Sequence, residues 1–149
     1  MSYQDNIQEV IDEHGWMVQA VFPTEDDPGY HFQYTIGLFE KGLPELVVYG
    51  LPYEVGGRLL NYLAEKSIKD GEYPAGHLIE NALENDLDLL AIDVTDNNEC
   101  WQARYRHEGK TVKVTQIVWP DKNNKFPWEN EAETNEGQFI PENFEMSER

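Results

Sequence analysis

Apolar residues at the start of the chain follow first a helical and then a strand period. Ser2 and Asp5 resemble a capping box, and apolar residues at helical spacing continue to Gly15, which predicts an amphipathic helix. Residues 16–22 and 30–39 place alternate side chains on opposite faces, which is the two-residue period of a strand. The turn residues between these two segments predict that the strands pair antiparallel.

The middle of the chain predicts a buried strand followed by a long helix. Residues 45–51 are an apolar, β-branched run of the kind found in buried strands. Pro52 then stands where a helix can begin, and an apolar stripe continues from it to about Asp70. Residues 87–95 and 111–119 are rich enough in apolar residues to predict two further strands.

The remaining segments are less regular. Residues 78–83 are ambiguous, and residues 96–106 fit either a short helix or irregular structure. Together the elements predict an α+β fold, with an antiparallel-rich sheet or a partly open small barrel packed by two main helices. We expect one globular domain over residues 1–128. Residues 129–149 are acidic with few large apolar side chains, which predicts a loosely held tail.

Charge and cysteine content narrow the possible partners and location. The formal charge of -18 over 149 residues repels nucleic-acid phosphate, so we expect no direct nucleic-acid binding, and it attracts a basic protein. Cys100 is the single cysteine, which gives no support to an oxidising compartment. Residues 1–12 lack the features of a secretory signal, and no apolar run is long enough to span a membrane. We therefore expect a cytoplasmic protein without a membrane partner.

Candidate ligand-binding residues lie on one strand face and at one helix start. The chain has no phosphate-binding, zinc-protease or nucleophile-elbow motif, so we lean against an enzyme, name no catalytic or metal-binding residue, and leave activity open. His31, Gln33 and Thr35 share a strand face that either lines a small-ligand cleft or meets water. Gly56-Gly57-Arg58 begins the second helix, where backbone N–H groups bind an anion or the glycines allow close packing on the sheet.

Aromatic residues near the end of the predicted domain suggest a second candidate surface. Trp119, Phe126 and Trp128 surround a turn that begins at Asp121. These side chains either hold the chain end against the core or form an aromatic surface for a partner protein. We name all four residues as partner-binding candidates.

Three stretches carry a family resemblance. They are residues 14–16, residues 34–38 with 44–46 and 50–51, and residues 119–121 with 126–128. In this order and spacing they resemble the bacterial family called domain of unknown function 4262, from about Ile7 to about Trp128. The resemblance implies a bacterial or phage setting, but it brings no established activity and no catalytic residues.

A second resemblance concerns layout alone. A strand, an apolar strand and a long helix in this order are similar to the flavin-reductase type of split barrel. That likeness implies flavin mononucleotide (FMN) as a cofactor, with Thr35, Gly37 and the helix start at Gly56 and Gly57 near its phosphate.

Two functional hypotheses follow. The first is a small acidic module without a cofactor that docks a basic protein, as an immunity or anti-defence inhibitor does. The alternative is a flavin- or nucleotide-binding domain, with enzymatic activity left open. A metal site assembled from the scattered histidines is a third possibility.

Overall fold

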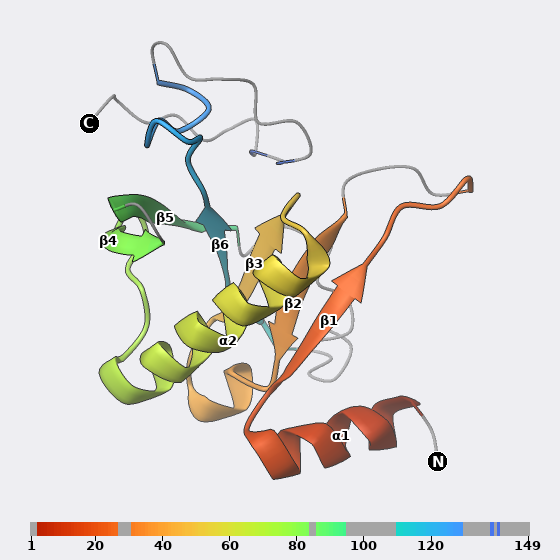
Figure 1. Cartoon of the computed structure of the whole chain (residues 1–149). Coiled ribbons are helices and arrows are strands. Elements are labelled where there is room, and N and C mark those ends of the chain that lie inside the picture. The colour runs from red at the N-terminus through yellow and green to blue at the C-terminus, as the bar shows by residue number, and fades with distance from the viewer. Residues whose placement is uncertain are drawn as a thin grey trace.

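One long helix lies across one face of a single sheet (Figure 1). The computed structural model describes residues 3–26, 31–83, 86–94, 110–129, 138 and 140. Within these residues, two helices, a short 3-10 turn and six strands follow in chain order: α1 (Tyr3–His14), β1 (Met17–Val21), β2 (Phe32–Ile36), η1 (Phe39–Lys41), β3 (Glu45–Tyr49), α2 (Tyr53–Asp70), β4 (Leu78–Leu83), β5 (Leu87–Asp93) and β6 (Val114–Val118).

The sheet is open and mostly antiparallel. Its described strands lie in the order β1-β2-β3-β6-β5-β4, so β1 and β4 are the two end strands. β3 pairs with β6 in parallel, and the other neighbours pair antiparallel. These findings confirm the α+β class and the antiparallel pairing of the first two strands. They favour the open sheet over the partly open barrel, because the described strands do not close on themselves.

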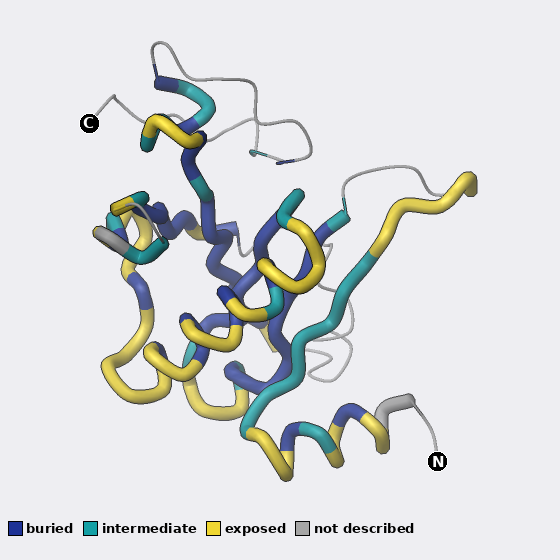
Figure 2. Tube along the Cα trace, in the orientation of Figure 1, coloured by how far each residue is buried: buried dark blue, intermediate teal, exposed yellow. Residues whose placement is uncertain are grey.

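Apolar side chains fill both faces of the sheet. On one face, Leu59, Leu60 and Leu63 of α2 pack over Leu46 and Val48 of β3 because they share one helical stripe. On the other face, Ile7 and Ile11 of α1 join the alternate residues of the central strands. Burial is therefore concentrated in β2, β3, β5 and β6, whereas the outer side of α2 is exposed (Figure 2).

The less regular segments have different outcomes. The ambiguous residues 78–83 form β4, which pairs with β5. The segment 96–106 lies outside the described residues. Glu129 and Gln138, which we assigned to a loosely held tail, are buried, and the Gln138 amide exchanges hydrogen bonds of 2.9 and 3.0 Å with the backbone of Trp119. Within the described part of the chain, neither helix has the length and apolar character needed to cross a membrane.

Candidate functional site

The polar face of β2 is covered by α2. Gln33 is 2% exposed, and its side-chain amide donates a hydrogen bond of 3.0 Å to the Tyr53 carbonyl at the start of α2. A Cβ atom at Gly56 would lie 1.9 Å from Gln33 Oε1, whereas one at Gly57 would lie 3.5 Å from Gln33 Nε2. Of the two glycines, Gly56 thus lies closer to the Gln33 side chain, which agrees with the close-packing interpretation of the two glycines. The face neither meets water nor lines an open cleft at Gln33.

Glu45 at the start of β3 is the most unusual charged group in the described structure. Its side chain is fully buried, and its two carboxylate oxygens accept four hydrogen bonds. The donors are the Thr35 hydroxyl at 2.8 Å and the backbone N–H groups of Gly37, Leu38 and Phe39 at 2.9, 3.0 and 3.3 Å. The carboxylate therefore fixes the turn that leads from β2 into the 3-10 turn.

Burial and hydrogen bonding act on Glu45 in opposite directions. Loss of water raises the pKa of this carboxyl, while the hydrogen bonds from Gly37, Thr35, Phe39 and Leu38 lower it. Burial has the larger effect, and the pKa rises from 4.5 to about 7. The group is buried too completely to touch a substrate, so we assign it a structural role.

Thr35 and Gly37 are both part of this arrangement. The Thr35 hydroxyl donates to Glu45 and accepts a hydrogen bond of 2.9 Å from the Leu46 backbone. Gly37 has a φ of +121°, and a Cβ atom there would meet the Trp16 backbone at 3.2 Å. Both residues are therefore engaged in contacts inside the protein. The flavin hypothesis instead needs them to face a phosphate.

Sequence reasoning missed Glu45 because it treated residues 45–51 as a uniform apolar strand. The available signal was a single carboxylate inside a run whose neighbours are all apolar. A buried carboxylate requires several donors, and the nearest source of free N–H groups is the turn around Gly37.

A cluster of aromatic side chains, two of them exposed, lies at the start of α2. The Phe22 ring stacks on His31 with a centroid distance of 6.1 Å and lies 6.1 Å from the Tyr53 ring. Phe22 and Tyr53 are 57% and 61% exposed, while a His31 ring nitrogen hydrogen-bonds the Leu51 carbonyl. Of the three candidates on this strand face, His31 therefore lies nearest to an accessible surface.

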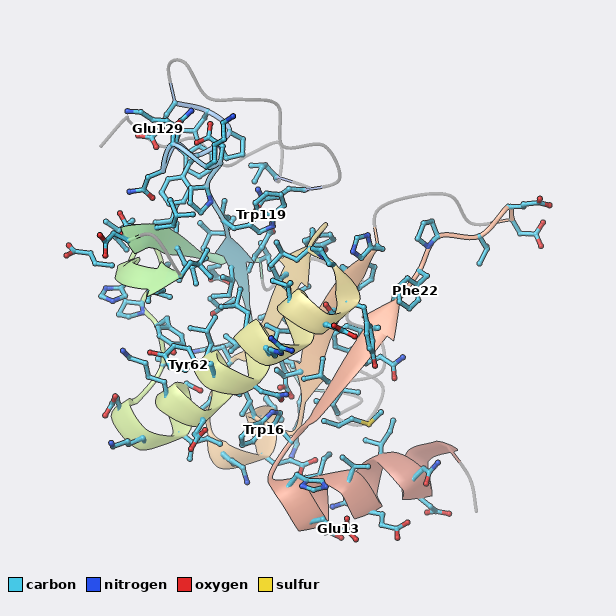
Figure 3. All side chains as sticks on the ribbon, in the orientation of Figure 1. Glu13, Trp16, Phe22, Tyr62, Trp119 and Glu129 are labelled. Carbon is cyan, nitrogen blue, oxygen red and sulfur yellow. The ribbon has the colours of Figure 1, made fainter. Side chains whose placement is uncertain are left out.

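A groove of about 580 Å³ lies between α2 and the β4–β5 hairpin. Its lining is mainly apolar: Val55, Arg58, Leu59, Tyr62, Ala82, Leu83 and Leu87. Val55 and Tyr62 are 46% and 52% exposed, and Arg58 is exposed as well. Figure 3 labels Tyr62 on α2 and Phe22 at the end of β1. We call Tyr53, Val55, Arg58 and Tyr62, together with this groove, the α2 surface.

The aromatic candidates near the end of the domain make internal contacts. The Trp119 indole N–H donates to the Tyr49 carbonyl at 2.7 Å, and Phe126 is buried and stacked on Trp128 at 5.3 Å. One Asp121 carboxylate oxygen accepts hydrogen bonds from the backbone N–H groups of residues 123 and 125, which closes the turn. This geometry holds the chain against the core, with Phe126 and Asp121 buried and Trp119 and Trp128 half-buried.

A histidine metal site has no support among the residues that the structure describes. No three His, Cys, Asp or Glu side chains gather there in a way that could hold a metal ion. His107 lies outside the described residues.

Comparison with protein-family models gives a match. A family model described as "Domain of unknown function (DUF4262)" matches residues 10–133. No curated protein and no solved structure matches the chain.

Proposed function

The chain belongs to the domain of unknown function 4262 family, whose description states no activity, and we propose from its surface that it is a protein-binding module for a basic partner. The partner docks on the α2 surface. The observation that carries this proposal is the exposed, mainly apolar groove beside Tyr62 on a chain whose net charge is -18.

The α2 surface has the chemistry of a protein interface. Tyr and Arg are the residue types that most often dominate binding energy, and both are exposed here beside apolar side chains. The groove offers a place for an apolar anchor from the partner, and removal of that anchor from water supplies affinity.

The net charge adds attraction over a longer range. A strongly anionic surface steers a cationic partner and disfavours other proteins of the same sign. An inhibitor that covers the basic site of another protein, of the immunity or anti-defence kind, is the class of molecule that this proposal describes.

The flavin alternative receives less support from the geometry. Thr35 and Gly37 bind Glu45, and the Gln33 amide binds Tyr53, so these groups are occupied by the protein itself. Arg58 and the start of α2 are accessible, but Arg58 lines the apolar groove. A rise in melting temperature on addition of FMN would favour this alternative over the protein-binding module.

The test is capture from a bacterial lysate on immobilised protein at about 50 mM and about 500 mM salt. We expect a basic protein to be retained at low salt and released at high salt. Tyr62→Ala should abolish its retention, because the side chain borders the groove. Ile68→Ala is the matched control, since Ile68 is also exposed on α2 but does not line the groove.

Two results would contradict the proposal. One is that no protein is retained at low salt. The other is that the Tyr62→Ala and Ile68→Ala variants retain the same partner equally well.

A further inference from the structure

β1 is an end strand without the features that usually protect a sheet edge. It occupies one end of the order of described strands, and its five residues, Met17–Val21, are all half-buried. Natural edge strands are often protected by charged side chains or proline, whereas this segment, MVQAV, contains neither. Its outer edge therefore offers backbone hydrogen-bonding groups to another extended chain.

One hydrogen bond establishes which backbone groups of β2 point toward β1 and which point toward β3. The Gly50 N–H donates to the His31 carbonyl at 3.0 Å, next to the pairing of Phe32 with Tyr49, so the His31 carbonyl points toward β3. Backbone groups of successive residues alternate between the two edges of a strand. The backbone groups of residues 32, 34 and 36 consequently point toward β1.

The same alternation identifies the outward groups of β1. Residues 32, 34 and 36 pair with residues 21, 19 and 17, which therefore use their backbone groups within the sheet. Val18 and Ala20 are left with their N–H and C=O groups at the outer edge. The Gln19 side-chain amide donates to the Ala20 carbonyl at 2.9 Å, as expected for a carbonyl that is not bonded to β2.

A hollow of about 520 Å³ adjoins this edge. It is lined by Val10 and His14 of α1, Asn61 of α2, and Trp16, Met17 and Val18 at the start of β1. Consecutive residues of a strand point to opposite faces, so a hollow lined by Met17 and Val18 lies at the edge of the strand. The indole N–H of Trp16, which Figure 3 labels, donates to the Asn61 side chain at 2.9 Å and connects the two walls.

We propose that β1 binds an extended segment of a basic protein by strand addition. In this mode backbone hydrogen bonds supply affinity, and a pocket for an alternate side chain supplies specificity. The hollow is such a pocket, because the segment beside Val18 places a side chain there. This inference concerns the outer edge of β1, which is separate from the α2 surface defined above, and it does not depend on the α2 surface being a binding site.

Charge identifies the occupant as a basic segment. In the chain, exposed carboxylates precede β1 on α1 and follow its last residue: Glu9, Asp12, Glu13, Glu25 and Asp26. One cation, the exposed Lys41, lies near Gly15 before the strand. The net charge of -18 attracts lysine or arginine side chains of an added strand. A second copy of this chain would bring two molecules of charge -18 together along the same edge, so self-pairing is disfavoured.

The test uses a pool of synthetic peptides of about nine residues, with alternating apolar positions at the centre and lysine or arginine at both ends. The pool is selected on the wild-type protein and on Ala20→Pro, which removes one outward N–H without touching the β1–β2 hydrogen bonds. Ala20→Val is the matched control, since it keeps the N–H at the same position. Urea unfolding checks that both variants are folded.

We expect the wild type and Ala20→Val to enrich the same peptides and to bind the best one within about 2-fold of each other. Ala20→Pro should bind it at least about 10-fold more weakly. N-methylation of alternate amides in the peptide should cause a similar loss, and this control leaves the protein unchanged. Tyr62→Ala should leave peptide binding unaltered, which separates this inference from the function proposed for the α2 surface.

Several outcomes would overturn the proposal. One is that the pool yields no peptide enriched on the wild type over Ala20→Pro, or that N-methylation has no effect on binding. A second is that acidic peptides with the same apolar pattern bind equally well. A third is that sedimentation equilibrium shows a wild-type dimer that Ala20→Pro abolishes, in which case the occupant is a second copy of the chain.

Discussion

Replacement of Glu45 by glutamine should remove one component of the pH dependence of stability. Burial raises the pKa of Glu45 from 4.5 to about 7, so the folded chain binds more protons than the unfolded chain between these values. The free energy of unfolding therefore falls as pH rises through this window. The side-chain amide in the Glu45→Gln variant does not titrate in this range, so the stability of that variant lacks this dependence on pH.

The size of the effect follows from the pKa values. The difference between 4.5 and about 7 corresponds to about 3 kcal/mol, at about 1.4 kcal/mol for each tenfold change in proton affinity. Proteins precipitate readily near the isoelectric point, which is about 4.3 for this chain, so the unfolding measurements begin near pH 5. From about pH 5 to about pH 8.5, about 2 to 3 kcal/mol of this change should be seen.

The assay is urea unfolding followed by tryptophan fluorescence, for both proteins at each pH. The quantity of interest is the unfolding free energy of the wild type minus that of Glu45→Gln, since the titration of the other carboxylates cancels. We expect this difference to fall as pH rises. A constant difference would show that the pKa of Glu45 is not raised, and a rising difference would show that the four hydrogen-bond donors outweigh burial.

Two further predictions concern stability and are checked by the same urea assay at constant pH. Gly56→Ala should lower the free energy of unfolding by about 1–3 kcal/mol, because a Cβ atom there displaces the buried Gln33 amide. Gly57→Ala should leave stability unchanged or raise it by up to about 1 kcal/mol. Equal effects of the two substitutions would contradict the close contact at Gly56. Asn124 has a φ of +62° and exchanges hydrogen bonds of 2.9 and 3.0 Å with Asp88, so Asn124→Ala should cost about 1–3 kcal/mol. Asn124→Gly keeps the backbone conformation and should cost less; an equal loss would assign the whole effect to the side chain.

The secondary structure could largely be predicted because periodicity records which faces are buried. The stripe after Pro52 predicted a helix to Asp70, and α2 spans Tyr53–Asp70. The alternation in residues 16–22 and 30–39 predicted two antiparallel strands, and their described parts are β1 and β2. The helix predicted to end at Gly15 is α1.

The arrangement of the polar groups could not be predicted in the same way, because it depends on contacts between distant segments. The alternation correctly placed Gln33 and Thr35 on one face, but it did not show that Tyr53 and Glu45 would occupy their side chains. The parallel pairing of β3 with β6 is likewise set by tertiary packing, since the two strands are far apart in sequence.

Described residues after residue 128 make contacts that composition did not indicate. Few large apolar residues after residue 128 favoured a loose tail. The Gln138 amide instead bonds the Trp119 backbone, and Ile140 packs against the core cluster of α1. A polar side chain can hold its own residue in place when its hydrogen bonds are made to backbone groups that would otherwise be unpaired.

Chemical-shift mapping of the backbone amides during titration with the captured basic partner tests the central claim most directly. The account predicts that the largest changes fall on residues 53–62 of α2 and on residues 82–87 beside the groove, among the residues that the structure describes. Changes concentrated on the turn at Gly37–Phe39 instead, with α2 unaffected, would contradict it.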